Sequence, residues 1–182
     1  MQLLRQLLCA AAALHLFAAP AAAQNFPTRP MRLIVPFAPG GASDFLARIL
    51  APKLSNELGQ PIVIENKPGA AGNIGMEAAA TAAPDGYTAF LGNVGTLAIN
   101  PAIFGPKIKA MAGDLTPVPL VATAPDVLVV GATMPVKSVA ELVNHARKHP
   151  GMSFASPGSG SLNRLEMELF RTGGQLDMVV GP

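Results

Sequence analysis

The stretch from Leu33 to Leu46, LIVPFAPGGASDFL, constrains the fold more than any other part of the chain. A short apolar run leads into Gly40 and Gly41, and Ser43 or Asp44 then stands before an apolar pattern with helical spacing. This order is typical of a buried strand, a tight turn and a capped helix start. The first N–H groups of a helix are free and carry partial positive charge, and glycine lets an anion approach them closely. We interpret the stretch as half of an anion-binding site.

Apolar runs alternate with helical patterns along the first hundred residues. The runs lack a polar alternation, which favours parallel strands that are covered on both faces. The spacing predicts strands over 31–37, 62–65 and 87–91, with helices over 43–58 and 73–83, the second capped by Asn73. Leucines at every fourth position, with Phe45 and Ile49 beside them, predict the buried face of the first helix, and Pro52 predicts a bend or break in it. The expected fold class is therefore α/β with a parallel sheet.

The second half repeats this alternation after an irregular stretch over 101–119. Strands are expected over 120–123, 127–131, 153–155 and 177–180, with helices over 138–148 and 161–172. Ser138 and Glu141 have the spacing of a capping box, and Ser161 precedes a stripe of apolar residues made of Leu162, Leu165, Leu169 and Phe170. We expect three parts, namely a signal peptide over 1–23, a first α/β lobe over 24–100 and a second over 101–182.

The N-terminus has the features of a secretory signal peptide. Arg5 precedes an apolar stretch, and Ala21-Ala22-Ala23 forms a small-residue cleavage pattern before Gln24. The sequence thus predicts export, with no membrane insertion after cleavage. Cys9 is the chain's one cysteine and lies inside this segment, so the mature protein would need no disulfide. Export without disulfides fits a periplasmic location.

Composition and motifs disfavour several classes of function. The formal net charge is only +2 over 182 residues and no basic run occurs, which argues against nucleic-acid binding. His145 and His149 have no acidic residue placed between them as a zinc-protease motif requires, and Gly158-Ser159-Gly160 is not a nucleophile elbow. We therefore expect no metal, no cofactor and no enzymatic activity.

Three loops share the order strand, glycine-rich turn and helix start. They are the first glycine loop (Pro39–Asp44), the middle glycine loop (Gly92–Thr96) and the last glycine loop (Ser156–Ser161). Such loops gather at the carboxyl ends of parallel strands, where ligands bind in open α/β sheets. Each loop alone is better explained as an ordinary turn, but the three together favour an anion site between two lobes.

An ordered set of stretches resembles one family of transport receptors. These stretches include RLIVPFAPGGASDFLAR, LGQPIVIENKPGAAGNIG, PDGYT, GTLAINPAIF and SPGSGSLNRLEMELF, and together they cover about Pro30 to Pro182. The chain resembles the solute-binding proteins of tripartite tricarboxylate transporters, the Bug family. This resemblance implies a periplasmic receptor with a type II binding-protein fold, two α/β lobes around a cleft, which binds small carboxylates and delivers them to membrane transporter subunits.

The resemblance also implies a ligand site made of backbone amides and ordered waters. Carried onto this chain, the site comprises Phe37, Pro39, Gly40, Gly41, Ala42, Ser43, Asp44, Asn93, Thr96, Ser156, Gly158, Gly160 and Ser161. The chain departs from the family pattern at Arg164, where a histidine is usual, and at Pro52 and Pro157.

Family members are also about twice as long as the mature chain. The second lobe and the segment that returns to the first are therefore expected to be incomplete, with weak ligand affinity as the consequence. Two alternatives stay open. The chain could be a non-functional fragment of such a receptor or, less readily, an enzyme that uses the loops for an anionic substrate.

Overall fold

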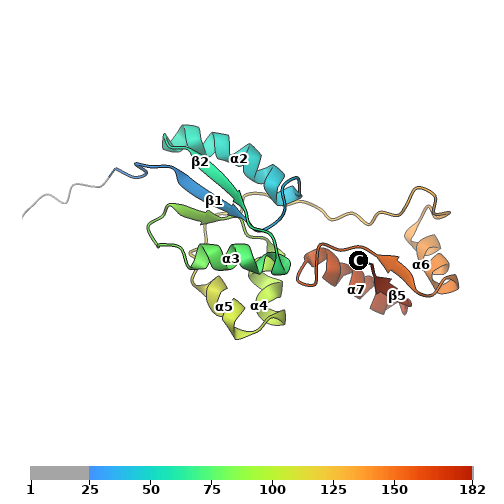
Figure 1. Ribbon diagram of the computed structural model, residues 1–182. Coiled ribbons are helices and arrows are strands. Elements are labelled where there is room, and N and C mark those ends of the chain that lie inside the picture. The colour runs from blue at the N-terminus through green and yellow to red at the C-terminus, as the bar shows by residue number, and fades with distance from the viewer. Residues whose placement is uncertain (1–24, 182) are drawn as a thin grey trace, which may run out of the picture.

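The structure is a computed structural model that describes residues 25–181. The expected signal peptide, over 1–23, lies outside these described residues. Within residues 25–181, no helix combines the length and the apolar character needed to cross a membrane. The described chain forms two α/β lobes joined by an extended connection (Figure 1).

The first lobe is built on a three-stranded parallel sheet. Its strands are β1 (Met31–Val35), β2 (Ile62–Asn66) and β3 (Thr88–Phe90), in the order β2-β1-β3. Met31 pairs with Ile62 and Val35 with Asn66, while Arg32 pairs with Thr88 on the other side. The parallel sheet predicted from the apolar runs is confirmed, with β1 and β3 shorter than predicted. Their carboxyl ends all meet at the same edge, which brings the following loops to one end of the lobe.

Helix α2 (Ala42–Leu58) covers one face of this sheet. Leu33, Val35 and Ala47 form the buried centre of the contact, and Ile62, Ile64 and Leu91 pack around them. The row of leucines on α2 is only half-buried, and Phe45 and Ile49, which were expected beside the core, are exposed. The small residues Ala47 and Ala51 lie nearest the sheet instead, because they allow the helix backbone to approach it closely.

Helix α2 runs without interruption through Pro52, so the predicted break is wrong. The proline ring is exposed, and it removes one N–H that would otherwise bond to the carbonyl of Arg48. Arg48 is also exposed, so water can satisfy the carbonyl that loses its partner. The helix ends at Gly59, which adopts a left-handed conformation with φ of 66°, as expected for a glycine cap.

The other face of the sheet is covered by α3 (Asn73–Ala80), which follows the short 3₁₀ turn η1 (Ala70–Gly72). Ile34 of β1 and Met76 of α3 are both fully buried in this layer. Gly75 lies against the chain just after β1, since a Cβ there would be 2.9 Å from Pro36 Cα. Asn73 was predicted to cap α3, but Gly72 occupies the cap position and Asn73 lies inside the helix.

Three short helical segments extend the first lobe below α3. They are the π-helical η2 (Gly95–Ile99), α4 (Asn100–Ile103) and α5 (Pro106–Gly113). Lys107 Nζ of α5 lies 3.0 Å from Glu77 Oε1 of α3, and Met111 of α5 is buried. The packing of the first lobe therefore continues to the end of α5.

The second lobe contains α6 (Val139–Lys148), β4 (Met152–Phe154), α7 (Leu162–Gly174) and β5 (Met178–Val180). The two strands are parallel, and Met152 pairs with Met178. The core centres on Ala146, Leu176 and Met178, with Met167 and Phe170 of α7 among the residues around it. The predicted apolar stripe of α7 is only partly right, because Leu165 and Leu169 are exposed.

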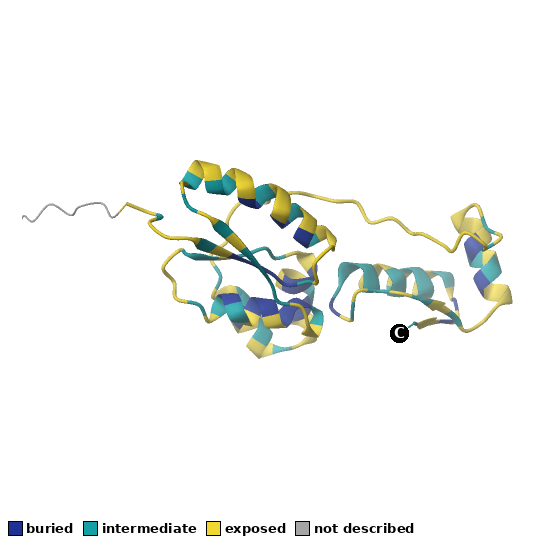
Figure 2. Cartoon of the chain, turned by 45° about the horizontal axis from the view of Figure 1, so that its top comes forward, coloured by how far each residue is buried: buried dark blue, intermediate teal, exposed yellow. Residues whose placement is uncertain are grey.

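The connection over 116–131 is extended and contains no strand, so the strands predicted over 120–123 and 127–131 are wrong. Val118 and Leu120 are each 79% exposed, and Val129 is 78% exposed. Their β-branched and apolar character favours a strand locally, but a strand also needs a neighbour to pair with its N–H and C=O groups. Figure 2 shows this connection exposed along its whole length.

Candidate functional site

The first glycine loop presents unpaired backbone N–H groups at the start of α2. Gly40 has a φ of 87°, a conformation that favours glycine, and Gly41 is the extended N-cap residue. The first helical bond runs from Phe45 N–H to the Gly41 carbonyl. No acceptor is recorded among the described residues for the amides of Ala42, Ser43 and Asp44, which precede it. The sequence led us to expect free donors from Gly41 to Asp44. Three of these four N–H groups are free, whereas Gly41 N–H donates to the Ala38 carbonyl at 3.4 Å.

Asp44 does not cap the helix, and neither does Ser43. The Asp44 side chain is only 2% exposed, and its carboxylate accepts hydrogen bonds from Gly40 N–H at 2.9 Å and Arg48 Nε at 2.8 Å. Asn66 at the end of β2 donates to Asp44 Oδ1 at 3.0 Å and also to the carbonyl of Phe37. Asp44 therefore turns into the lobe and fixes the shape of the loop.

The hydrogen bonds from Arg48, Gly40 and Asn66 lower the pKa of Asp44 to about 2. The carboxylate therefore stabilises the fold above its ordinary pKa, and this contribution is lost as the pH falls from about 4 through about 2. We expect an Asp44→Asn variant to be less stable than the parent at pH 7, with a difference that narrows towards pH 2. Urea unfolding across this pH range measures it, and Glu57→Gln on the exposed side of α2 is the control. A difference that does not change with pH would contradict the prediction.

The last glycine loop is organised by its serine cap. Ser161 Oγ accepts from Arg164 N–H at 3.2 Å and donates to the Gly158 carbonyl at 2.7 Å. Gly158 has a φ of 130°, which a residue with a side chain rarely adopts. Ser161 thus caps α7 as predicted. The N–H groups of Leu162 and Asn163 precede the first helical bonds, and the described residues offer them no recorded acceptor.

The middle glycine loop is closed by bonds between two of its own residues. Asn93 Oδ1 accepts from Thr96 N–H at 3.0 Å, and Thr96 Oγ1 accepts from Asn93 N–H at 3.0 Å. Thr96 is fully buried, whereas Asn93 is exposed. The Thr96 side chain therefore supports the loop from within, and the Asn93 amide nitrogen is the group of this pair that remains for a ligand.

The structure brings the middle and last glycine loops into contact. A Cβ on Gly95 would lie 2.7 Å from the carbonyl oxygen of Gly160. Phe37, two residues before the first glycine loop, lies in the same region, because a Cβ on Gly72 would meet both Thr96 and the Phe37 ring. Pro39, Gly40, Gly41 and Ala42 are exposed, and Ser156 is half-buried. No contact between the first and last glycine loops themselves is recorded among residues 25–181.

Two asparagines that support the loops were not singled out from the sequence. Asn66 holds the first glycine loop by donating to the Phe37 carbonyl and to Asp44 Oδ1. Asn100 donates to the carbonyl of Ala71 and to Asn73 Oδ1. Asn66 is the last residue of β2, and a polar residue at the carboxyl end of a parallel strand is the signal that could have identified it. Asn100 follows no such pattern in the sequence.

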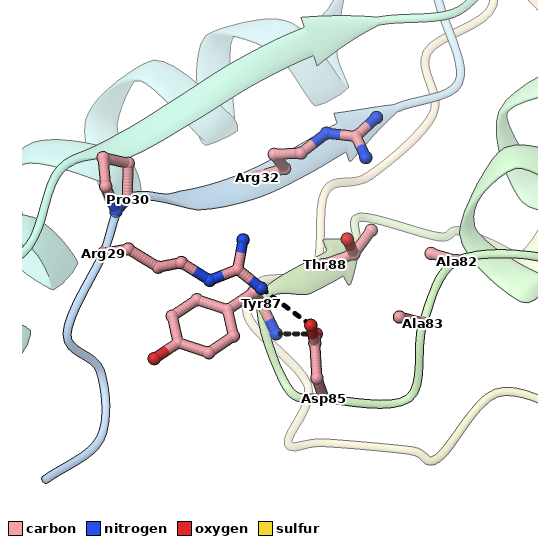
Figure 3. Close-up of a pocket in the computed structure, with 8 residues that line it drawn as sticks. All are labelled: Arg29, Pro30, Arg32, Ala82, Ala83, Asp85, Tyr87 and Thr88. Atoms are coloured by element: carbon pink, nitrogen blue, oxygen red, sulfur yellow. Dashed lines mark hydrogen bonds and ion pairs between the residues drawn. The ribbon is translucent and has the colours of Figure 1, made fainter.

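The recorded cavities lie away from the glycine loops. A cavity of about 220 Å³ is lined by Arg29, Arg32, Asp85 and Tyr87 with four neighbours (Figure 3). Arg29 pairs with Asp85 at 2.7 Å and lies over the Tyr87 ring, and Arg32 pairs with Glu65. These residues stand at the amino ends of β1 and β3, opposite the end that carries the loops. Among the described residues, no cluster of acidic, histidine or cysteine side chains could hold a metal ion.

Comparisons with known proteins place the chain among bacterial transport receptors. Residues 46–181 match the family described as the tripartite tricarboxylate transporter family receptor. Protein BugT of Bordetella pertussis is 40% identical over 166 residues, which are 89% of this chain and 51% of BugT. The chain spans about half the length of the curated relatives it matches.

Solved structures agree with this assignment. MatC from Rhodopseudomonas palustris with bound malate aligns with a TM-score of 0.78 and 34% identity, over 86% of this chain and 54% of MatC. Rpa4515 of R. palustris with adipate aligns with a TM-score of 0.72 and 32% identity, over 86% of this chain and 53% of that one. The α/β fold and the likeness to this receptor family expected from the sequence are thus confirmed, and the chain belongs to the tripartite tricarboxylate transporter receptor family.

Proposed function

We propose that this chain acts in a receptor that binds small organic carboxylates and supplies them to a tripartite transporter. The observation that carries the proposal is the set of free backbone N–H groups of Ala42, Ser43 and Asp44 at the start of α2. Hydrogen bonds from backbone N–H groups to a charged acceptor are shorter and stronger than bonds between neutral groups. A carboxylate at this loop would also meet the positive end of a helix of 17 residues.

The surroundings of the loop support an anionic ligand. The Asp44 carboxylate is buried behind the loop, where hydrogen bonds from Gly40, Arg48 and Asn66 offset its charge. Gly40, Gly41 and Ala42 are exposed, and because the two glycines have no side chain and the alanine has only a methyl group, an anion has room to reach the backbone. One carboxylate group of the ligand would be held by the start of α2 and the residues before it, namely Phe37, Pro39, Gly40, Gly41 and Ala42 to Asp44. The start of α7 would face this group from the second lobe, through Ser156, Gly158, Gly160 and Ser161. Asn93 would lie between the two.

Family membership supports the location and the partners. Receptors of this family are periplasmic, and they work with membrane transporter subunits. We infer the same location and a transient contact with membrane subunits for this chain, with release of the unchanged ligand. Binding without turnover is the activity that this arrangement of backbone donors provides.

Titration calorimetry on the full chain tests the proposal. Malate and adipate are the probes, because these compounds are bound in the similar solved structures. The corresponding neutral diamides are matched controls of the same shape. We expect both acids to bind and to raise the midpoint of thermal unfolding, and the diamides to do neither. Equal behaviour of acids and diamides, or no response to any di- or tricarboxylate, would overturn the proposal.

A further inference from the structure

Asn100 has a side-chain amide whose orientation is fixed by the first lobe. It is the first residue of α4 and is fully buried. Its Nδ2 donates to the Ala71 carbonyl at 2.9 Å and to Asn73 Oδ1 at 2.7 Å. A backbone carbonyl can only accept a hydrogen bond, so the amide nitrogen must face Ala71. The carbonyl oxygen of Asn100 must therefore point the other way.

This oxygen is buried without a hydrogen-bond partner. Among the described residues, Asn100 Oδ1 is the only buried side-chain nitrogen or oxygen atom in that state. Buried polar atoms in native proteins nearly always have a partner, so each exception needs a physical reason. The oxygen lies next to Gly160, because a Cβ on Gly160 would strike it. An amide held by the first lobe thus points at the last glycine loop in the second lobe.

A second contact crosses the same junction. A Cβ on Gly95 would lie 2.7 Å from the Gly160 carbonyl oxygen, and a Cβ on Gly160 would lie 3.0 Å from Ala71 Cβ. Gly95 and Gly160 are both buried, and neither has a positive φ. Their lack of a side chain is therefore required by the close approach of the two lobes rather than by backbone conformation.

We propose that Asn100 is a positioning residue that docks the last glycine loop on the first lobe. The first lobe holds its amide nitrogen, and its free oxygen accepts a backbone N–H of the last glycine loop when the two lobes close, with or without an anion between them. The part about the anion rests on the proposed function, whereas the docking contact itself does not need a ligand. Closure would set the separation between the starts of α2 and α7, and with it the length of anion that can bridge them.

Distance measurements between the two lobes test this role without any ligand. Labels on Lys53→Cys in α2 and Glu166→Cys in α7 report the separation, in a Cys9→Ser background that has no other cysteine. We expect Gly160→Ala to shift the distance distribution to longer values, because its methyl group would strike the Asn100 oxygen. Gly131→Ala, where an added Cβ meets nothing within 4 Å, is the matched control and should leave the distribution unchanged.

Variants of Asn100 separate docking from a purely structural role. Asn100→Leu removes the amide at similar size and should broaden the distribution to longer distances. The double variant Asn100→Ala/Gly160→Ala should recover part of the shift seen for Gly160→Ala, because the shorter side chain leaves room for the methyl group. Urea unfolding of each variant identifies any that fail to fold, and Gly160→Ala remains informative if Asn100→Leu is one of them.

The outcomes are distinguishable from those of the proposed function. An unchanged distribution in Gly160→Ala, or no recovery in the double variant, would overturn the docking role whatever the chain binds. If the distances shift as expected while malate and adipate fail to bind, the docking role stands and the proposed function alone fails. If the acids bind, Gly160→Ala should also weaken their affinity, because the closed arrangement is then less populated.

Discussion

Replacing Ile34 by alanine is expected to destabilise the first lobe by about 2–5 kcal/mol, the usual cost of removing a large aliphatic side chain from a core. Ile34 is fully buried at the centre of β1, between β2 and β3, and α3 covers its face with the fully buried Met76. A three-stranded sheet has few other side chains that could move to fill the cavity. Small domains have only about 5–15 kcal/mol of stability in total, so the loss is a large part of it.

Urea unfolding followed by circular dichroism measures this loss. Val63→Ala on the neighbouring strand β2 is the matched control, because Val63 is 47% exposed and its truncation should cost less than Ile34→Ala. Val35 of β1 would be a poor control, because its side chain is also buried, on the opposite face of the sheet against α2. Equal losses for Ile34→Ala and Val63→Ala would mean that α3 does not form the core described here.

The parallel sheet was predictable because its signals are local. Leu33, Ile34 and Val35 form an apolar run without alternation, and both faces of β1 are indeed covered, by α2 and α3. The helix starts at Ser138 and Ser161 were also predictable, since each serine bonds to the N–H three residues later. In both cases, the residues that decide the structure are close neighbours in the chain.

The wrong predictions occur where contacts with residues far away in the sequence determine the local structure. The segment over 127–131 has a strong local preference for a strand, yet it has no neighbour to pair with and remains extended and exposed. Asp44 looks like a helix cap from its position alone, but Arg48 and Asn66 draw its carboxylate into the lobe. The capping box of α6 differs only locally: Ser138 Oγ caps the helix as predicted, but the Glu141 carboxylate accepts from Lys137 N–H, one residue before the cap.

The candidate site was predictable as loops but not as individual contacts. The order of strand, glycines and helix start correctly places free amides after Gly41 and after Ser161. The mutual bonds of Asn93 and Thr96, which bury Thr96, depend on three-dimensional packing that spacing alone does not reveal. The membership of the thirteen predicted residues in one ligand site therefore stays a prediction.

Gly41→Val tests that prediction most directly, and it should weaken carboxylate binding by about 2 kcal/mol or more, roughly 30-fold, if two amide bonds to a charged group are lost. Gly41 has a φ of −77° and a ψ of 169°, which valine adopts readily. A Cβ at Gly41 would meet only the Ala38 carbonyl oxygen, at an ordinary 3.5 Å. The substitution should therefore leave the fold intact and place its methyl groups where the anion approaches.

Gly40 would give a less clear answer at the same loop. Its φ of 87° means that any side chain there strains the backbone, so Gly40→Val would change the loop and the binding together. Gly131→Val is the suitable control, because Gly131 lies in the exposed connection, lacks a positive φ and has open space around it. Calorimetry with malate and adipate, together with thermal unfolding of both variants, completes the comparison.

The expected pattern is an unfolding midpoint that Gly41→Val does not change, with a large loss of affinity for both acids in that variant alone. Such a result would assign the loss to the blocked amides of Ala42, Ser43 and Asp44, because the fold and the buried Asp44 carboxylate would be unaffected. If Gly41→Val binds both acids as tightly as the parent, the first glycine loop is only a turn and the ligand is held elsewhere. If both valine variants lose affinity equally, the effect is general to the chain and the loop has no special role.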